Sequence, residues 1–132
     1  MKFYIADGSK LGLRRLLTLL GDRSDFELVG YSADVTAAII SIQTVKPQVV
    51  ILDLDMRGRN GIDVLKAVKR DLPSAIFIIV TNASGEQYRR HCKELGAEYF
   101  LDKSTEFVRI PDIMQDISAQ HQLKMKSEIV NG

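Results

Sequence analysis

The apolar run 49–52, which ends abruptly on the carboxylate of Asp53, constrains the fold of this chain more than any other segment. Its four consecutive large aliphatic residues show no polar alternation, a pattern that favours a strand buried on both faces inside a parallel sheet. The acidic side chain that follows would emerge at the carboxyl edge of the sheet, where open α/β sheets bind their ligands. Asp53 is therefore placed for chemistry.

Short apolar strands alternate with amphipathic helices along the rest of the chain. We expect strands at residues 3–6, 26–31, 49–52, 75–80 and 99–101. Between and after them, apolar residues at helical spacing predict five helices whose buried stripes are Leu13, Leu16, Leu17 and Leu20; Val35, Ala38, Ile39 and Ile42; Ile62, Leu65 and Val68; Tyr88, Cys92 and Leu95; and Ile110, Ile113, Met114 and Ile117. This alternation predicts an α/β fold, a flavodoxin-like, doubly wound, five-stranded parallel sheet of order 2-1-3-4-5 with five helices.

Length and composition predict a single domain. Of the 132 residues, 45% are hydrophobic, and we expect residues 1–122 to form the domain and residues 123–132 a C-terminal tail or an extension of the last helix. The net charge of +1 argues against direct binding of nucleic acid. No apolar run approaches the roughly 20 residues of a membrane span, and the N-terminus reaches an acid too soon for a signal peptide. We therefore expect a cytoplasmic protein that does not bind a membrane.

Four of the predicted strands end on hydrophilic groups. Asp7 follows the first strand, Asp53 the third, Thr81 the fourth and Lys103 the fifth. In a 2-1-3-4-5 sheet the first and third strands are neighbours at the topological switch point, so Asp7 and Asp53 should face each other. Two acids, a hydroxyl and an ammonium that converge on one cleft can hold a divalent cation and a phosphoryl group.

The segments that carry these groups resemble the receiver domain of two-component response regulators. The matching motifs are Ile5-Ala6-Asp7, residues 51–61, Val80-Thr81-Asn82 and residues 95–103, and the resemblance extends from residue 2 to about residue 120. One such motif would be a weak signal, whereas four in the right order and spacing are a strong one.

The resemblance implies a function in phosphorelay signal transduction rather than an enzyme. Asp53 would be the phosphoacceptor, receiving a phosphoryl group from a sensor histidine kinase, a phosphotransfer protein or a small acyl phosphate. Mg²⁺ would be held by Asp7, Asp53 and Asp55, and the phosphoryl oxygens would be bound by Thr81 and Lys103.

Phe100 would be the switch residue, since the resemblance implies that it rotates when Thr81 moves inward. That rotation would alter the surface that a downstream protein, not identified by the sequence, recognises. The sequence leaves open whether the chain forms a homodimer.

Gly8 and Arg57 are two of the residues that depart from the receiver pattern. Gly8 stands where receivers carry a second acid that ligates the metal directly, so we expect weak Mg²⁺ binding, which Asp55 would compensate in part. Arg57 stands where proline is common and adds a charge near the pocket. The pair Arg14-Arg15, by contrast, is expected to be solvated helix surface.

Two alternative functions stay open at this point. Gly8 favours a degenerate receiver, which would serve as a protein-interaction module without being phosphorylated. The segment Asp53-Leu54-Asp55 also resembles the nucleophile motif of haloacid dehalogenase-type phosphatases. Against the phosphatase, the motif falls on the third strand, and the chain has no room for a substrate cap.

Overall fold

The computed structural model describes residues 1–82 and 85–131 of the chain. Five parallel strands form one sheet of order β2-β1-β3-β4-β5, which confirms the predicted topology. In chain order the elements are β1 (Lys2–Ala6), α1 (Lys10–Leu20), β2 (Glu27–Ser32), α2 (Val35–Val45), β3 (Val49–Leu52), α3 (Ile62–Asp71), β4 (Ile76–Thr81), α4 (Glu86–Glu94), β5 (Tyr99–Asp102), a short 3₁₀ helix (Phe107–Arg109) and α5 (Ile110–Asn131).

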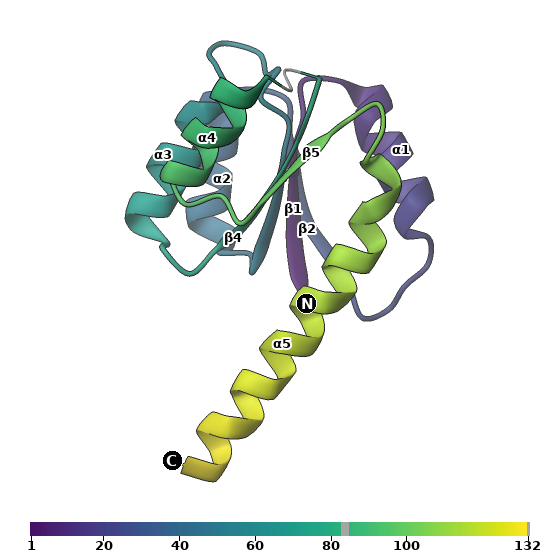
Figure 1. Cartoon of the computed structure of the whole chain (residues 1–132), viewed down its shortest axis with the longest axis vertical. Helices are drawn as coiled ribbons and strands as arrows, with labels where there is room; N and C mark the ends of the chain where they lie inside the picture. The colour runs from purple at the N-terminus through teal and green to yellow at the C-terminus, as the bar shows by residue number, and fades with distance from the viewer. Residues whose placement is uncertain (83–84, 132) are drawn as a thin grey trace.

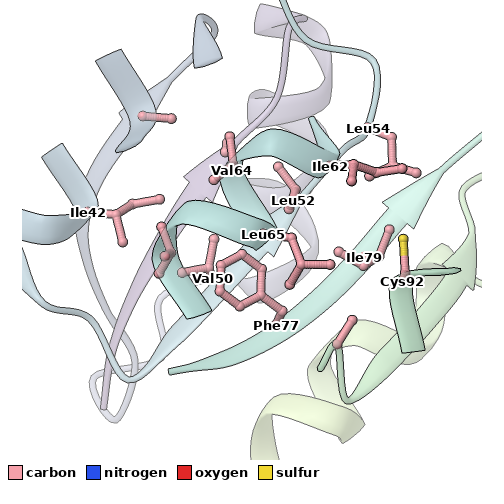
Figure 2. Packing of buried hydrophobic residues seen from close by; sticks show 14 of the residues in the cluster. Ile42, Val50, Leu52, Leu54, Ile62, Val64, Leu65, Phe77, Ile79 and Cys92 are labelled. Atoms are coloured by element: carbon pink, nitrogen blue, oxygen red, sulfur yellow. The ribbon is translucent and has the colours of Figure 1, made fainter. Parts of the chain in front are cut away.

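The helices cover the sheet in two layers. Helices α2, α3 and α4 lie on one face, and α1 and α5 lie on the other (Figure 1). This arrangement explains why β3 is apolar at every position, because its alternate side chains enter two different cores. Val50 and Leu52 pack under α2 and α3, as Figure 2 shows, whereas Val49 and Ile51 pack on the side of α1 and α5.

Most residues of the predicted helical stripes are buried, including the whole stripes of α3 and of the first half of α5. The sequence was wrong about Leu17 and Tyr88, whose side chains are 40% and 41% exposed. Leu17 lies one turn before the end of α1, whose packed face is formed by the buried Leu16 and Leu20 and the partly buried Leu13 and Leu19. On α4, Cys92 is the one fully enclosed residue.

Helix ends are fixed by local chemistry. Ser9 caps α1 and Asp34 caps α2, each accepting a hydrogen bond from a backbone N–H in the first helical turn. Gly21, at a φ of 64°, ends α1. Helix α5 runs unbroken past residue 122, and its last turns extend away from the sheet (Figure 1). Within the described ranges, no helix combines the length and the apolar character that crossing a membrane requires.

Candidate functional site

The register of the sheet brings the predicted site residues to one edge. Ala6 of β1 pairs with Leu52 of β3, so the next residues, Asp7 and Asp53, leave the sheet at the same level. A hydrogen bond of 2.9 Å from the Asp53 amide to the Ala6 carbonyl holds the two strand ends together. On the other side, the Lys103 amide donates to the Thr81 carbonyl at 3.0 Å, which aligns the end of β5 with that of β4.

Lys103 joins the two acids directly. Its Nζ donates to Oδ2 of Asp53 at 2.7 Å and to Oδ2 of Asp7 at 3.0 Å. Both carboxylates are nearly enclosed, with only 4% of Asp7 and 6% of Asp53 exposed. Three charges from residues far apart in the sequence therefore meet in one largely dehydrated cluster, where their mutual attraction is strong because water does not screen it.

The ammonium of Lys103 stays protonated in this environment. Burial by itself would lower its pKa, but hydrogen bonding to Asp53, the charge of Asp53 and the same two effects from Asp7 outweigh burial and raise the pKa above its ordinary value. Lys103 therefore keeps a positive charge beside Asp53 across the physiological pH range.

Backbone groups orient both carboxylates. The second oxygen of Asp7, Oδ1, accepts from the Ser9 amide at 2.9 Å, and Oδ1 of Asp53 accepts from the Asp55 amide at 2.9 Å. Gly12 makes room for Asp7, since a Cβ at position 12 would lie 2.1 Å from Asp7 Oδ2. The acids are thus fixed in position by hydrogen bonds and by the missing side chain of one helical glycine.

The other predicted site residues lie around this cluster. Thr81 is fully buried at the end of β4 and lines, with Asp53 and Asp55, a hollow next to the ion pairs. The Asp55 residue is exposed. Phe100 is 9% exposed on β5, and the guanidinium of Arg89 lies 4.9 Å from its ring centroid and donates to its carbonyl at 3.1 Å.

At Gly8 the loop after β3 approaches β1 more closely than an acid would allow. The Gly8 amide donates to the Asp55 carbonyl at 3.3 Å, and a Cβ at position 8 would lie 2.6 Å from that same oxygen and 3.3 Å from the Met56 Cα. Real Cβ atoms essentially never come as close as 2.6 Å. An acid at this position would therefore require the loop to move outward.

The residues present offer a divalent ion fewer carboxylates than the receiver pattern does. Mg²⁺ favours several oxygen ligands, but here the ammonium of Lys103 already lies between the carboxylates of Asp7 and Asp53, and Gly8 contributes no carboxylate. No group of three or more His, Cys, Asp or Glu side chains able to hold a metal ion occurs in the described part of the chain. The assignment of Asp7, Asp53 and Asp55 as metal ligands stays a prediction.

Arg15 is a charged pocket residue that the sequence analysis did not assign to the site. Arg15 is exposed on α1, as expected, and it also lines the pocket at Asp7 and Asp53 together with Leu11. The signal was available, because Arg15 lies four residues after Leu11, at the spacing that puts two side chains on the same helix face. Without the position of the helix over the sheet, however, neither face could be assigned to the pocket.

Comparison with known proteins agrees with this geometry. Residues 3–115 match the profile of the response regulator receiver domain. The chain belongs to the response regulator receiver domain family. Receiver domains interact with histidine kinases or phosphotransfer proteins and typically bind Mg²⁺ at their acidic pocket. They are generally not enzymes, although some are joined to enzymatic domains.

Two curated relatives illustrate the proteins in which similar receiver domains occur. The DNA-binding transcriptional activator EvgA of Escherichia coli is 33% identical over 103 residues, which cover 78% of this chain and 50% of the relative. A protein-glutamate methylesterase/protein-glutamine glutaminase of Clostridium acetobutylicum is 28% identical over 120 residues, 89% of this chain and 34% of the relative. The chain therefore spans half or less of the length of these relatives.

Solved structures have the same fold. The receiver domain of a putative LuxO repressor protein from Vibrio parahaemolyticus superposes with a TM-score of 0.84 at 22% identity, covering 99% of this chain and 97% of that one. The isolated receiver domain of RcsB from Salmonella enterica serovar Typhimurium was determined in the presence of the phosphomimetic BeF₃⁻. It superposes with a TM-score of 0.80 at 26% identity, covering 87% of this chain and 86% of that one.

Proposed function

We propose that this receiver domain accepts a phosphoryl group on Asp53 from a sensor histidine kinase, a phosphotransfer protein or a small acyl phosphate. The observation that carries the proposal is the contact of the Lys103 ammonium with Asp53 and Asp7 at the aligned strand ends. A fixed positive charge beside the attacking oxygen would bind the incoming phosphoryl oxygens and stabilise the negative charge that they carry in the transition state.

In the proposed transfer, an oxygen of the Asp53 carboxylate forms a new bond to phosphorus. The bond between phosphorus and the leaving group breaks at the same time, and its electron pair stays on the histidine nitrogen or the acyl oxygen. Lys103 keeps its proton throughout, because its raised pKa opposes proton loss at neutral pH. The Thr81 hydroxyl would donate to a second phosphoryl oxygen.

The proposed readout of phosphorylation is a change at Phe100. If Thr81 turns toward the phosphoryl group, the space that it leaves would admit the Phe100 ring, which now lies under Arg89. Rotation would separate the ring from the guanidinium and change the surface formed by α4, β5 and α5. A downstream protein that recognises one of these two surfaces would bind in a phosphorylation-dependent way.

Intact-mass measurement after incubation with acetyl phosphate and Mg²⁺ tests this proposal. We expect wild type to gain one phosphoryl group and Asp53→Ala to gain none. Asp22→Ala, which removes an exposed acid from the turn after α1, should behave as wild type. An adduct that persists in Asp53→Ala would contradict the assignment of the phosphoacceptor.

The close contact at Gly8 favours a second candidate function. A receiver whose pocket binds Mg²⁺ poorly could act as an interaction module whose surface does not depend on phosphorylation. Absence of an adduct on folded wild-type protein, with donor and Mg²⁺ both in excess, would support this second function over the first. Circular dichroism establishes in the same sample that the chain is folded.

A further inference from the structure

The pocket above Asp53 balances its charges without a metal. It has a volume of about 400 Å³, and six charged residues among the described part of its lining contribute equal numbers of opposite charges. The carboxylates are those of Asp7, Asp53 and Asp55, and the cations are Lys103, Arg15 and Arg57. With an acid at position 8 the same lining would carry one net negative charge. Gly8, Arg15 and Arg57 therefore all make the net charge of the pocket lining less negative.

Arg15 is held at one wall of this pocket by an aromatic ring. Its guanidinium carbon lies 4.7 Å from the centroid of Phe107, a distance at which the ring attracts the cation. Phe107 is itself buried, with 8% of its surface exposed, and therefore offers a fixed platform. The exposed Arg15 side chain is thus kept near the pocket mouth although it forms no ion pair with the pocket acids.

Arg57 lines the same pocket from a loop whose backbone is fixed. Its amide donates to the Ala33 carbonyl at 2.9 Å, and its carbonyl accepts from the Val35 amide at 3.0 Å. These two bonds join the loop after β3 to the start of α2.

We propose that Arg15 and Arg57 bind the oxygens of the phosphoryl group entering at Asp53 and supply positive charge that a divalent cation provides in most receivers. This inference rests on the proposed phosphorylation of Asp53. A guanidinium presents paired N–H donors that match phosphate oxygens, and both arginines line the pocket that the transferring group would enter. The consequence is a phosphotransfer that depends only weakly on Mg²⁺.

The test follows phosphorylation by acetyl phosphate in excess EDTA and in excess Mg²⁺. The acetyl oxygen leaves with the electron pair of its bond to phosphorus as the bond to Asp53 forms, so intact mass reports the adduct directly. We expect wild type in EDTA to be phosphorylated at a rate within about tenfold of that in Mg²⁺, which is about 1.4 kcal/mol in the activation free energy.

The chain offers a matched control pair for the two arginines. Arg14 adjoins Arg15 on α1 and Arg59 shares the loop of Arg57, yet neither lines the pocket. We expect the double variant Arg15→Gln/Arg57→Gln to lose at least about tenfold in the EDTA rate. Arg14→Gln/Arg59→Gln should retain that rate. Arg15→Lys, which keeps the charge, should retain more of the EDTA rate than the Arg15→Gln/Arg57→Gln double variant.

The possible outcomes separate the inference from the proposed function. If wild type is phosphorylated in Mg²⁺ but not in EDTA, or if both double variants lose the EDTA rate equally, the arginine inference is overturned while Asp53 remains the phosphoacceptor. If folded wild type shows no adduct in either condition, the proposed function fails and the inference that rests on it fails too.

Discussion

Adding a single methyl group at position 8 measures how tightly the loop after β3 packs against β1. In Gly8→Ala the new Cβ would lie 2.6 Å from the Asp55 carbonyl oxygen and 3.3 Å from the Met56 Cα. Both atoms belong to the backbone and cannot rotate away as a flexible side chain could. The loop must therefore retreat, which lengthens or breaks the 3.3 Å hydrogen bond from the Gly8 amide to the Asp55 carbonyl.

The expected cost combines three contributions. Strain from an extra group in a closely packed region is about 1–3 kcal/mol. Loss of a hydrogen bond adds about 0.5–1.5 kcal/mol. Alanine also makes the unfolded chain less flexible than glycine does, which stabilises the folded state by about 0.4–1 kcal/mol. Because retreat of the loop relieves strain as it breaks the bond, the first two contributions do not add fully, and we expect Gly8→Ala to lower the free energy of unfolding by about 1–3 kcal/mol.

Gly8→Asp adds charge to the same strain. Without a divalent ion, a fourth acid would join a pocket whose three carboxylates are already matched by three cations, so we expect a larger loss of stability than in Gly8→Ala. With Mg²⁺ the new carboxylate can ligate the ion. An ion that binds only the folded state raises the free energy of unfolding by about 2.7 kcal/mol when its concentration is 100 times its dissociation constant. Wild type and Gly8→Ala should gain much less from Mg²⁺.

Urea unfolding followed by circular dichroism, in EDTA and in Mg²⁺, measures all of these free energies. Gly85→Ala is the steric control, because among the described residues, its chain neighbours apart, a Cβ at position 85 meets no atom within 4 Å. A Gly8→Ala variant as stable as wild type to within about 0.5 kcal/mol would refute the close packing of the loop. A Gly8→Asp variant that gains no more stability from Mg²⁺ than wild type would refute the view that the missing acid weakens metal binding.

Two further predictions concern Lys103 and Arg89. Lys103→Gln leaves the carboxylates of Asp7 and Asp53 buried without a cation and should cost about 3–5 kcal/mol in the free energy of unfolding. Since the folded pKa of Lys103 is raised, its contribution is complete below the unfolded pKa of about 10.4 and is lost as pH rises through the folded value. The difference from wild type should therefore shrink in strongly alkaline urea titrations, and a constant difference would contradict the ion-pair origin. Arg89→Ala removes the cation over the Phe100 ring and a hydrogen bond, so we expect a loss of about 1 kcal/mol and a more mobile ring in NMR relaxation, whereas Arg90→Ala should change neither.

The sequence predicted the sheet well because the pattern of β3 has a single physical explanation. A strand with aliphatic side chains at every position must bury both faces, and the two cores that receive Val50 and Val49 confirm this. Surface helices were predicted less well. Leu17 and Tyr88 have the spacing of buried residues, but other side chains of the same helices already cover the sheet and leave these two exposed.

The site was predictable for a related reason. Side chains that follow neighbouring parallel strands must emerge at one edge, so the meeting of Asp7 and Asp53 follows from strand order alone. The sequence also marked Gly8 as a missing acid. It could not reveal that the loop carrying Asp55 has closed onto Gly8, because that depends on a distance between backbone atoms of two separate segments.

The sequence alone specified the alternation of apolar strands and helices and the number of strands, since each apolar pattern has one stable way of being buried. It also specified which acids enter the pocket, because they directly follow those strands. The ammonium of Lys103 was predicted at the same edge, but the arrangement of the cations around those acids was decided only by the tertiary structure. Lys103 lies between both of them, and Arg15 lines the same pocket because α1 packs over the end of β1. Such neighbours are set by how helices pack on the sheet, and residue spacing along the chain does not encode that packing.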